Sequence, residues 1–337
     1  MENTSLSAIS LYFNFWRESN EKCLDEKELS RTYNNLTERY KQFDSISEEY
    51  FSLSLKELFS CEGSECLLND EQTKNIIQRL KASTVNGKLS KDIFVAMFQY
   101  WTRKSISTVN ALLIVDVQND FITGSLRLDQ CPAKENAEEV VPIINNLIKN
   151  GPFDVLTYTA DWHPEDHCSF FSNIKKHSAK VHPSVNMADL KLFDVVPFIK
   201  PAELQQVMWP DHCLQNSWGA QLHKELRKPI ENEDIVVYKG QNAHLDSYST
   251  FFDNGKCNKT DLLLQLLKRN VTHVYLVGLA FDVCVAYSAV DSAQIGFNTA
   301  VIEDACKGVD FKSMEATRNK FSEMGIKLLK CSDFTLP

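Results

Sequence analysis

The spacing of hydrophobic and polar residues changes near residue 105 of this 337-residue chain. Before that point the apolar residues follow helical spacing, as in Leu36, Tyr40 and Phe43, which would lie on one face of a helix. From Ala111 onward, short apolar runs alternate with longer amphipathic stretches, a pattern typical of β-α-β units. The polar segment 102–108 separates the two patterns. We therefore predict a helical region over 1–105 and an α/β domain over 106–337.

Within the α/β domain, the pattern predicts individual strands and helices. Apolar runs predict strands at 112–115, 153–158, 235–238, 273–277 and 299–302. Amphipathic stretches predict helices at 137–150, 218–227, 261–269, 285–295 and 313–324. Strands that alternate with helices form a parallel sheet, and in an open parallel sheet the chemistry collects at the carboxyl ends of the strands.

Composition narrows the classes of function. The chain has 36 basic and 45 acidic side chains, and its net charge of −9 argues against a dedicated nucleic-acid binder. No apolar run approaches the ~18 residues that a membrane span needs, and the first residues lack the basic and apolar segments of a secretory signal. The ten cysteines lie singly, without CxxC spacing, as expected for reduced thiols. We expect a protein of the cytoplasm, with the nucleus as an additional location, that binds neither nucleic acid nor membrane.

Reactive side chains follow four of the predicted strands. Asp116 follows the first strand, Asp161 and His163 follow the second, and Lys239 follows the third. The fourth strand leads through a short Gly-Leu-Ala segment to Cys284. Because these strand ends meet at one edge of a parallel sheet, an acid, an imidazole, an amine and a thiol are predicted to form an active site there.

Cys284 is the candidate nucleophile of this site. It follows a strand at the start of an apolar helix, where backbone N–H groups and the helix dipole favour a thiolate. A nearby Lys239 ammonium would lower the pKa of the thiol further, and Asp116 could accept or deliver the proton. The alternative is that Cys284 is a small buried hydrophobic residue, as most cysteines are. The other reactive residues at the strand ends favour the interpretation of Cys284 as a nucleophile.

Asp161 and His163 are candidate metal ligands. In an extended segment residues i and i+2 point the same way, so this pair can share a ligand, and His212 in a Pro-flanked turn can supply a third group. A carboxylate and two imidazoles leave coordination positions open, and this set accepts zinc, manganese or iron. The alternative is a turn in which Asp161 caps a helix and His163 is exposed. The other histidines are predicted to lie on the surface, among them His167, His177, His182 and His223.

Five segments also match a known family in its own order. They are ALLIVDVQNDFITGSL (111–126), TADWHPEDHCSF (159–170), WPDHCLQNSWGAQL (209–222), VVYKG (236–240) and VYLVGLAFDVCVAYSAVDSAQIGF (274–297). These segments resemble the nicotinamidases of the isochorismatase-like hydrolase superfamily, and the resemblance covers about 110 to 333. It implies a three-layer α/β/α fold with a mostly parallel sheet, preceded here by a small all-α domain.

The resemblance implies roles for the residues at the strand ends. Cys284 would be the nucleophile, Asp116 the general acid/base and Lys239 the third member of the triad. Backbone N–H groups at Ala280 and Cys284 would stabilise the oxyanion, next to a cis peptide between Leu279 and Ala280. The expected reaction is hydrolysis of nicotinamide to nicotinic acid and ammonia through a cysteine thioester, which feeds NAD salvage. Pyrazinamide, an isosteric ring amide, is expected to react as well.

The resemblance further implies how the substrate is bound. A divalent metal, usually zinc, would be held by Asp161, His163 and His212 and would orient the pyridine ring. A flat, neutral ring calls for an apolar, aromatic pocket, and by matched position the ring contacts are Phe121 and Trp209. Tyr248 is a further candidate, with simple core filling as its alternative. Val283 stands where some members carry a larger side chain, so the range of substrates stays open.

The helical region contains a stretch, 85–94, that resembles an EF-hand loop with its flanking helices. With Gly87 at the sixth loop position, the first ligand positions fall on Ala82, Thr84 and Asn86 and the twelfth on Ile93. Calcium needs several oxygen ligands and usually a Glu at the last position, so this loop offers too few. We expect a structural or oligomer-contact role for residues 1–105, and the second of these roles would make the protein a homo-oligomer. Calcium sensing and an unrelated helical cap are the alternatives.

Two other functions compete with the nicotinamidase hypothesis. A superfamily hydrolase that acts on a carbamoyl or vinyl-ether substrate would generally lack the metal-binding set, which this chain contains. A catalytically silent interaction protein would lack a nucleophile, a base or a ligand, whereas this chain contains every member of both sets.

Overall fold

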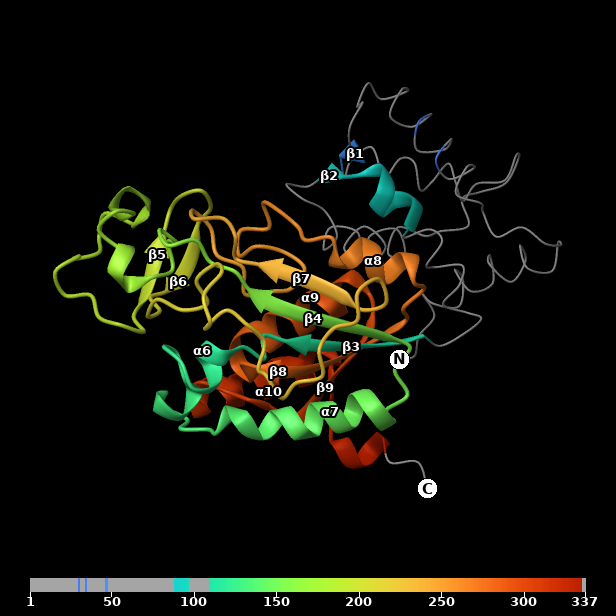
Figure 1. Ribbon diagram of the computed structural model, residues 1–337. Helices are drawn as coiled ribbons and strands as arrows, with labels where there is room; N and C mark the ends of the chain where they lie inside the picture. Colours follow the sequence, from blue (N-terminus) through green and yellow to red (C-terminus); the bar gives the residue numbers. More distant parts are fainter. Residues whose placement is uncertain (1–29, 31–33, 35–45, 48–87, 97–108, 335–337) are drawn as a thin grey trace. The chain divides into compact units, whose positions relative to one another are not determined.

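The computed structural model describes residues 30, 34, 46–47, 88–96 and 109–334 (Figure 1). The chain divides into two compact units. One consists of Val109–Leu262, His273–Ala293 and Phe297–Pro337, and the other of Met1–Thr108, Leu263–Thr272 and Gln294–Gly296. The predicted EF-hand positions before residue 88 lie outside the described residues, so the expectations about calcium and oligomer contacts stay predictions.

A six-stranded sheet forms the centre of the first unit (Figure 1). In spatial order its strands are β10 (Lys327–Leu329), β9 (Asn298–Lys307), β8 (His273–Leu279), β3 (Asn110–Val115), β4 (Val155–Asp161) and β7 (Ile235–Lys239). All neighbouring strands are parallel, so their carboxyl ends lie at one edge. The five predicted strands are confirmed as β3, β4, β7, β8 and β9, and β10 extends the sheet beyond them.

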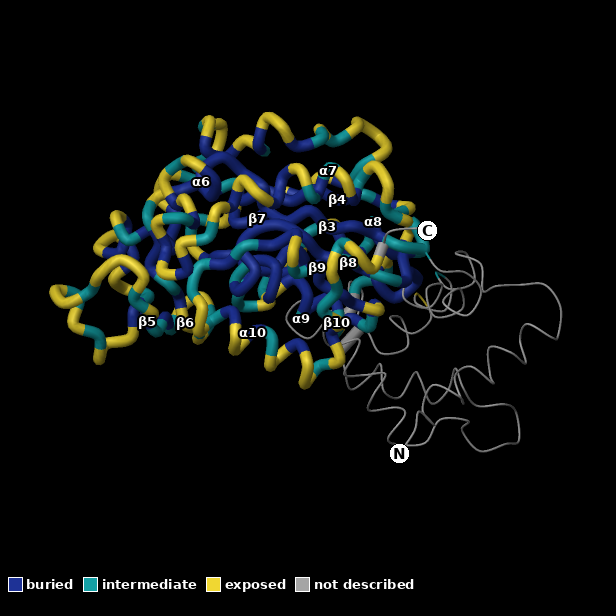
Figure 2. Tube along the Cα trace, turned by 90° about the horizontal axis from the view of Figure 1, so that it is seen from below, coloured by how far each residue is buried: buried dark blue, intermediate teal, exposed yellow. Residues whose placement is uncertain are grey.

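The sheet is covered by helices on both faces, which confirms the three-layer α/β/α fold. Helix α7 (Val140–Asn150) covers one face, and α9 (Ala286–Ile295) and α10 (Phe311–Met324) cover the other (Figures 1 and 2). Strand β3, central in the sheet, reads as a continuous apolar run because it is buried on both sides. The apolar stripe of α7 packs into the same core through Val140, Val141, Ile144 and Leu147. Two shorter helices are α6 (Asn119–Ile122) and α8 (Leu262–Lys268).

The sequence prediction of a helix over 218–227 is wrong, because the structure has turns there. The backbone of this segment is bonded to the residues that follow β3. Asn119 N donates to Gln221 O, and Asp120 N donates to Gly219 O, both at 3.0 Å. Carbonyls that accept these long-range bonds are not aligned for the i to i+4 ladder of a helix. Segment 218–223 is therefore fixed beside the end of β3.

Smaller elements complete the described structure. An antiparallel pair, β5 (Val195–Phe198) and β6 (Leu204–Val207), lies in a long insertion between β4 and β7 and has its own small core. A second pair, β1 (Ile46–Ser47) and β2 (Lys88–Leu89), belongs to the other unit. Short 3₁₀ turns occur at Leu128–Gln130, Ala137–Glu139, Phe171–Asn173, Ser178–Lys180 and Cys331–Phe334. Among the described residues, no helix is both long and apolar enough to cross a membrane.

The close approach of β8 to β3 generates a stability prediction. Gly278 has φ of +109°, and a Cβ there would lie 2.2 Å from the carbonyl oxygen of Val115. Gly278→Ala should therefore reduce the free energy of unfolding by about 3 kcal/mol or more, through backbone strain and overpacking. Gly325→Ala is the matched control, because Gly325 also has positive φ (+70°) but a Cβ there would meet nothing within 4 Å, so about 1 kcal/mol is expected. Equal losses in urea titrations of the two variants would contradict the steric argument.

Candidate active site

The carboxyl edge of the sheet gathers the predicted residues from four strands. Asp116 follows β3, Asp161 is the last residue of β4, and Lys239 is the last residue of β7, paired with Asp161 in register. Strand β8 leads into a single π-helical turn, Phe281–Val285, which carries Cys284. All four side chains are buried. The structure therefore places the acid, the carboxylate ligand, the amine and the thiol in one cluster.

Lys239 is the centre of this cluster. Its Nζ lies 2.9 Å from Asp116 Oδ2 and also forms a short ion pair with Asp161 Oδ1. The same ammonium donates to the carbonyl of Ser247 at 3.1 Å and lies 3.3 Å from Cys284 Sγ. Burial alone would lower the pKa of Lys239, but the two carboxylates outweigh it and hold the pKa well above its usual range. The side chain is a permanent buried cation that contacts every other member of the cluster.

Asp116 is held by its neighbours in a left-handed backbone conformation, with φ of 48°. Thr159 Oγ1 donates to Asp116 Oδ1 at 2.6 Å. Burial raises the pKa of the Asp116 carboxyl, and the negative charge of Asp161 adds to this, while Lys239 and Thr159 act in the opposite direction. The pKa stays above its ordinary value, so this carboxyl can hold a proton as well as release one.

The environment of Cys284 corrects one expectation from the sequence. The residue lies within the π-helical turn rather than at the first turn of α9, which begins at Ala286. Burial raises the pKa of the thiol well above its usual value, and the carboxylates of Asp116 and Asp161 add to this. Lys239 lowers the pKa, as expected, but does not outweigh the other effects. The resting sulfur is therefore a thiol that needs a base, and Asp116 is next to it.

Asp161, His163 and His212 form the predicted metal set. Asp161 Oδ2 lies 3.6 Å from His163 Nε2 and 3.9 Å from His212 Nε2. Ligand atoms about 2.1 Å from a shared ion lie roughly 3.5 Å apart, so these separations fit a divalent metal. The far nitrogens, His163 Nδ1 and His212 Nδ1, contact the carbonyl oxygens of Gly240 (2.9 Å) and Pro210 (2.7 Å). With Nδ1 as donor, each Nε2 lone pair faces the carboxylate, as metal-binding histidines require.

The charges of this set are strongly coupled. Burial would raise the pKa of Asp161, but Lys239 and His163 outweigh it and hold the carboxyl ionised. Burial would likewise lower the pKa of His163, but Asp161 raises it above the usual value. Burial and the His163 charge lower the pKa of His212 to about 4. The site thus presents an ionised carboxylate beside two imidazole rings.

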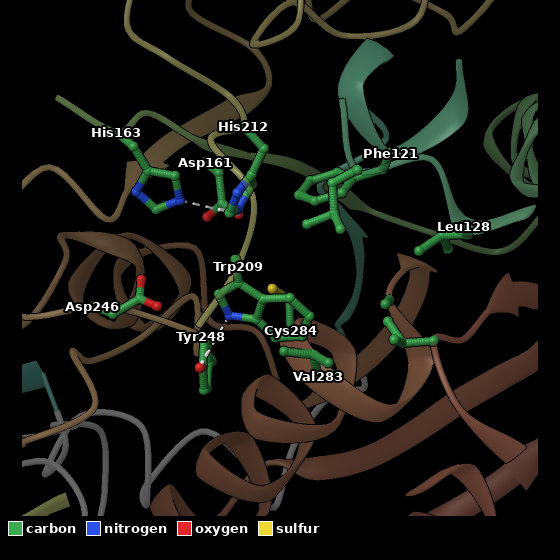
Figure 3. A pocket seen from close by; sticks show the side chains of 13 residues that line it. Phe121, Leu128, Asp161, His163, Trp209, His212, Asp246, Tyr248, Val283 and Cys284 are labelled. Carbon is green, nitrogen blue, oxygen red and sulfur yellow. Dashed lines mark hydrogen bonds and ion pairs between the residues drawn. The ribbon is translucent and has the colours of Figure 1, made fainter. Parts of the chain in front are cut away.

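A pocket opens beside both sets (Figure 3). The space between its lining residues is about 400 Å³, a volume that includes space open to solvent. Its lining residues are Phe121, Leu126, Leu128, Asp161, His163, Trp209, His212, Asp246, Tyr248, Ala280, Val283, Cys284 and Val309. The three aromatic residues proposed from the sequence as ring contacts are therefore all in the lining. In Figure 3, Asp161, His163 and His212 lie together at one side, with Phe121 and Leu128 beyond them.

The predicted oxyanion region also lies at this pocket. The Leu279–Ala280 peptide is cis, as the resemblance implied. Ala280 and Cys284 both line the pocket. The side chains of Trp209 and Tyr248 are linked, since Trp209 Nε1 donates to Tyr248 Oη at 3.2 Å (Figure 3). The aromatic wall is thus fixed by a hydrogen bond as well as by packing.

Asp246 and His167 are site residues that the sequence did not reveal. Asp246 lines the pocket, and its Oδ2 accepts from Gln206 Nε2 at 3.1 Å. His167, predicted to lie on the surface, is buried, with its ring centroid 4.2 Å from that of His163. His177 and His223 are buried too, and of the four histidines predicted as exposed, only His182 is exposed. Their spacing carried no signal because loops, not strand ends, bring them inward.

Comparison with known proteins agrees with this geometry. The model of the Isochorismatase domain family matches residues 110–330, so the chain belongs to this family. The sequence prediction of an isochorismatase-like hydrolase is thereby confirmed. A nicotinamidase from Acinetobacter baylyi is 37% identical over 59% of this chain and 82% of its own length.

Two solved structures share the fold. An Acinetobacter baumanii nicotinamidase and pyrazinamidase has a TM-score of 0.57 and 34% identity, and the match covers 68% of this chain and all of that one, 100%. PnC1 from L. infantum, solved in complex with nicotinate, has a TM-score of 0.53 and 30% identity, and the match covers 67% of this chain and 94% of that one. Both matches correspond in extent to the α/β domain.

The buried ion pairs of Lys239 generate a second stability prediction. Lys239→Met would leave the Asp116 and Asp161 carboxylates without their cation, so the metal-free protein should lose about 3 kcal/mol of unfolding free energy. Arg127→Met is the control, because Arg127 pairs with Asp129 through side chains that are 44% and 34% exposed, and it should cost much less. Denaturant titrations measure both, and similar losses would show that burial does not set the strength of the Lys239 pairs.

Proposed function

We propose that this chain is a nicotinamidase that hydrolyses nicotinamide to nicotinic acid and ammonia. The observation that carries the proposal is the meeting of a thiol, an amine and a carboxyl beside one pocket. Lys239 Nζ lies 3.3 Å from Cys284 Sγ and 2.9 Å from Asp116 Oδ2. The nicotinamidases among the relatives, and the complex of the L. infantum protein with nicotinate, support the choice of substrate.

The pocket lining suits a flat, neutral ring. Phe121, Trp209 and Tyr248 supply aromatic surface, and the Trp209–Tyr248 hydrogen bond fixes two of them relative to each other. Leu126 and Leu128 add apolar surface. We propose that the ring of the substrate binds among these side chains, with its carboxamide toward Cys284. Pyrazinamide has the same shape and is an expected second substrate.

We propose that Asp161, His163 and His212 hold a divalent cation, zinc in the first place, although manganese and iron accept the same ligands. Bound there, the cation supplies a Lewis acid for a ring nitrogen, which restricts the orientation of the substrate. Asp161 also pairs with Lys239, so the proposed metal set and the proposed triad share one carboxylate.

In the first half of the proposed reaction, Asp116 takes the proton of the Cys284 thiol, and Lys239 stabilises the resulting thiolate at 3.3 Å. The sulfur attacks the amide carbon, and the electron pair of the carbonyl moves onto its oxygen. Backbone N–H groups of Ala280 and Cys284 are proposed to stabilise this oxyanion. When the carbonyl re-forms, the C–N bond breaks, the nitrogen takes the proton from Asp116, and ammonia leaves.

The second half hydrolyses the thioester. Asp116 takes a proton from water, and the hydroxyl oxygen attacks the thioester carbon. The C–S bond breaks, its electron pair returns to sulfur, and Asp116 gives the proton back to Cys284 as nicotinic acid leaves. A carboxyl whose pKa is raised suits both duties, because it must hold a proton between the steps. We propose that the product feeds NAD salvage.

Ammonia release from nicotinamide tests the nucleophile. Cys284→Ala should lower kcat by about 10⁴-fold or more, since the thioester can no longer form. Cys306→Ala is the matched control, because both cysteines are 6% exposed but Cys306 lies on β9, outside the pocket. A wild-type protein without ammonia release, or a Cys284→Ala variant with wild-type activity, would refute the proposal.

Metal removal tests the other half of the site. After treatment with a chelator, ammonia release should fall at least about 10-fold, and added zinc should restore it, because the ring is no longer oriented. Metal analysis before and after treatment accompanies the assay. Full activity in a protein shown to contain no metal would exclude a catalytic role for Asp161, His163 and His212 as ligands.

A further inference from the structure

We propose that Gln118 and Asp120 are positioning residues that fix the backbone beside two of the three proposed metal ligands. The inference rests on the proposed metal site and concerns side chains behind it. Both residues follow Asp116 closely in the sequence, and both are buried. Neither side chain is among the pocket-lining residues, so any effect they have on the metal must pass through the ligands.

Gln118 holds the Asp161 segment from both sides. Its Oε1 accepts the backbone N–H of Asp161 at 2.8 Å, and its Nε2 donates to the carbonyl of the same residue at 2.8 Å. The second proton of Nε2 goes to the carbonyl of Ala220, also at 2.8 Å. A single amide thus uses both donors and its acceptor on backbone groups. Rotation of the peptides that flank Asp161 would break these bonds, so the direction of its Cα–Cβ bond is fixed, and Lys239 contacts the carboxylate itself.

Asp120 does the same for the His212 segment. Its Oδ2 accepts the backbone N–H of Cys213, the residue after His212, at 2.7 Å. Cys213 has φ of 47°, a conformation that a non-glycine residue adopts only with support from its surroundings. The carbonyl of Cys213 in turn accepts the backbone N–H of His163 at 3.0 Å. Asp120 therefore supports Cys213, the residue whose two backbone groups connect the His212 segment to Asp120 and to His163.

The surroundings of Asp120 are fitted to its carboxylate. A Cβ on Gly219 would lie 2.0 Å from Asp120 Oδ2, and a Cβ on Gly124 would lie 2.2 Å from Oδ1. Oδ1 also accepts the backbone N–H of Ser125 at 3.0 Å. Two glycines thus leave room for this carboxylate, which shows that its position is specified by the sequence around it.

The arrangement explains how ligands from distant segments meet. Asp161 ends β4, whereas His212 comes from the far side of the insertion that contains β5 and β6. The segment after β3 carries the proposed acid/base Asp116 and also contacts both ligand segments. Outer-shell hydrogen bonds of this kind typically change metal affinity by about 10- to 100-fold. We therefore assign Gln118 and Asp120 to the alignment of the metal set with the triad.

The test measures zinc affinity of the full-length protein without substrate. Gln118→Glu keeps the size of the side chain but loses both donors, and Asp120→Asn places an NH₂ group where an acceptor is needed. The matched controls are Asn145→Asp and Asp304→Asn. Asn145 donates to the carbonyl of Glu225, and Asp304 accepts the backbone N–H of Cys331, both away from the pocket.

Competition with a chromophoric chelator gives the zinc dissociation constant, and the visible spectrum of the Co²⁺-loaded protein reports ligand geometry. Gln118→Glu and Asp120→Asn should raise the dissociation constant about 10- to 100-fold and alter the Co²⁺ spectrum. The control variants should shift the melting temperature of the metal-free protein but leave both metal readouts unchanged. Should Gln118→Glu fail to fold, Asp120→Asn carries the test, because among the described residues the Asp120 side chain accepts only two backbone N–H groups, those of Cys213 and Ser125.

Two outcomes would overturn the proposal. One is a Gln118→Glu or Asp120→Asn protein that is less stable but binds zinc with wild-type affinity, which would make the bonds structural only. The other is a folded wild-type protein that binds no zinc. The ammonia assay on the wild-type protein is a separate measurement. If the zinc affinities of the variants change as expected but the wild-type protein does not hydrolyse nicotinamide, the proposed function is refuted and the positioning role of Gln118 and Asp120 is retained.

Discussion

The buried ammonium of Lys239 is the interaction on which the rest of the site depends. Two buried carboxylates, Asp116 and Asp161, lie beside it, and burial without a cation would favour the protonated form of each. The same ammonium lies against Cys284 Sγ. The acid/base, the thiol and the carboxylate ligand are therefore coupled through one charge.

The strand order of the parallel sheet brings the coupled groups close together. Strands β3, β4 and β7 are neighbours, so the residues at their carboxyl ends are separated by the spacing of the strands alone. Strand β8 brings the π-helical turn with Cys284 to the other side of β3. A pocket beside such an edge can expose one substrate to a nucleophile and to a metal set at the same time.

The loops make the larger contribution to the metal set. His212 belongs to a turn that returns from the β5–β6 insertion, and its position depends on backbone bonds to the segment after β3 and to His163. Related contacts explain why segment 218–227 is not a helix, since the carbonyls of Gly219 and Gln221 accept the backbone N–H groups of Asp120 and Asn119 instead of N–H groups four residues later in the segment. The failed helix prediction and the alignment of the ligands thus have one physical cause.

Five of the six strands of the central sheet, and the residues that follow each of them at its carboxyl end, could be predicted from the sequence. These follow from local apolar runs and from the rule that parallel strands share an edge, so Asp116, Asp161, Lys239 and Cys284 could be placed together in advance. The burial of His167, the place of Asp246 in the pocket lining and the contacts of Gln118 and Asp120 became visible only in the folded chain. Those depend on which distant loops pair with one another, and loop pairing leaves no periodic pattern in a single sequence.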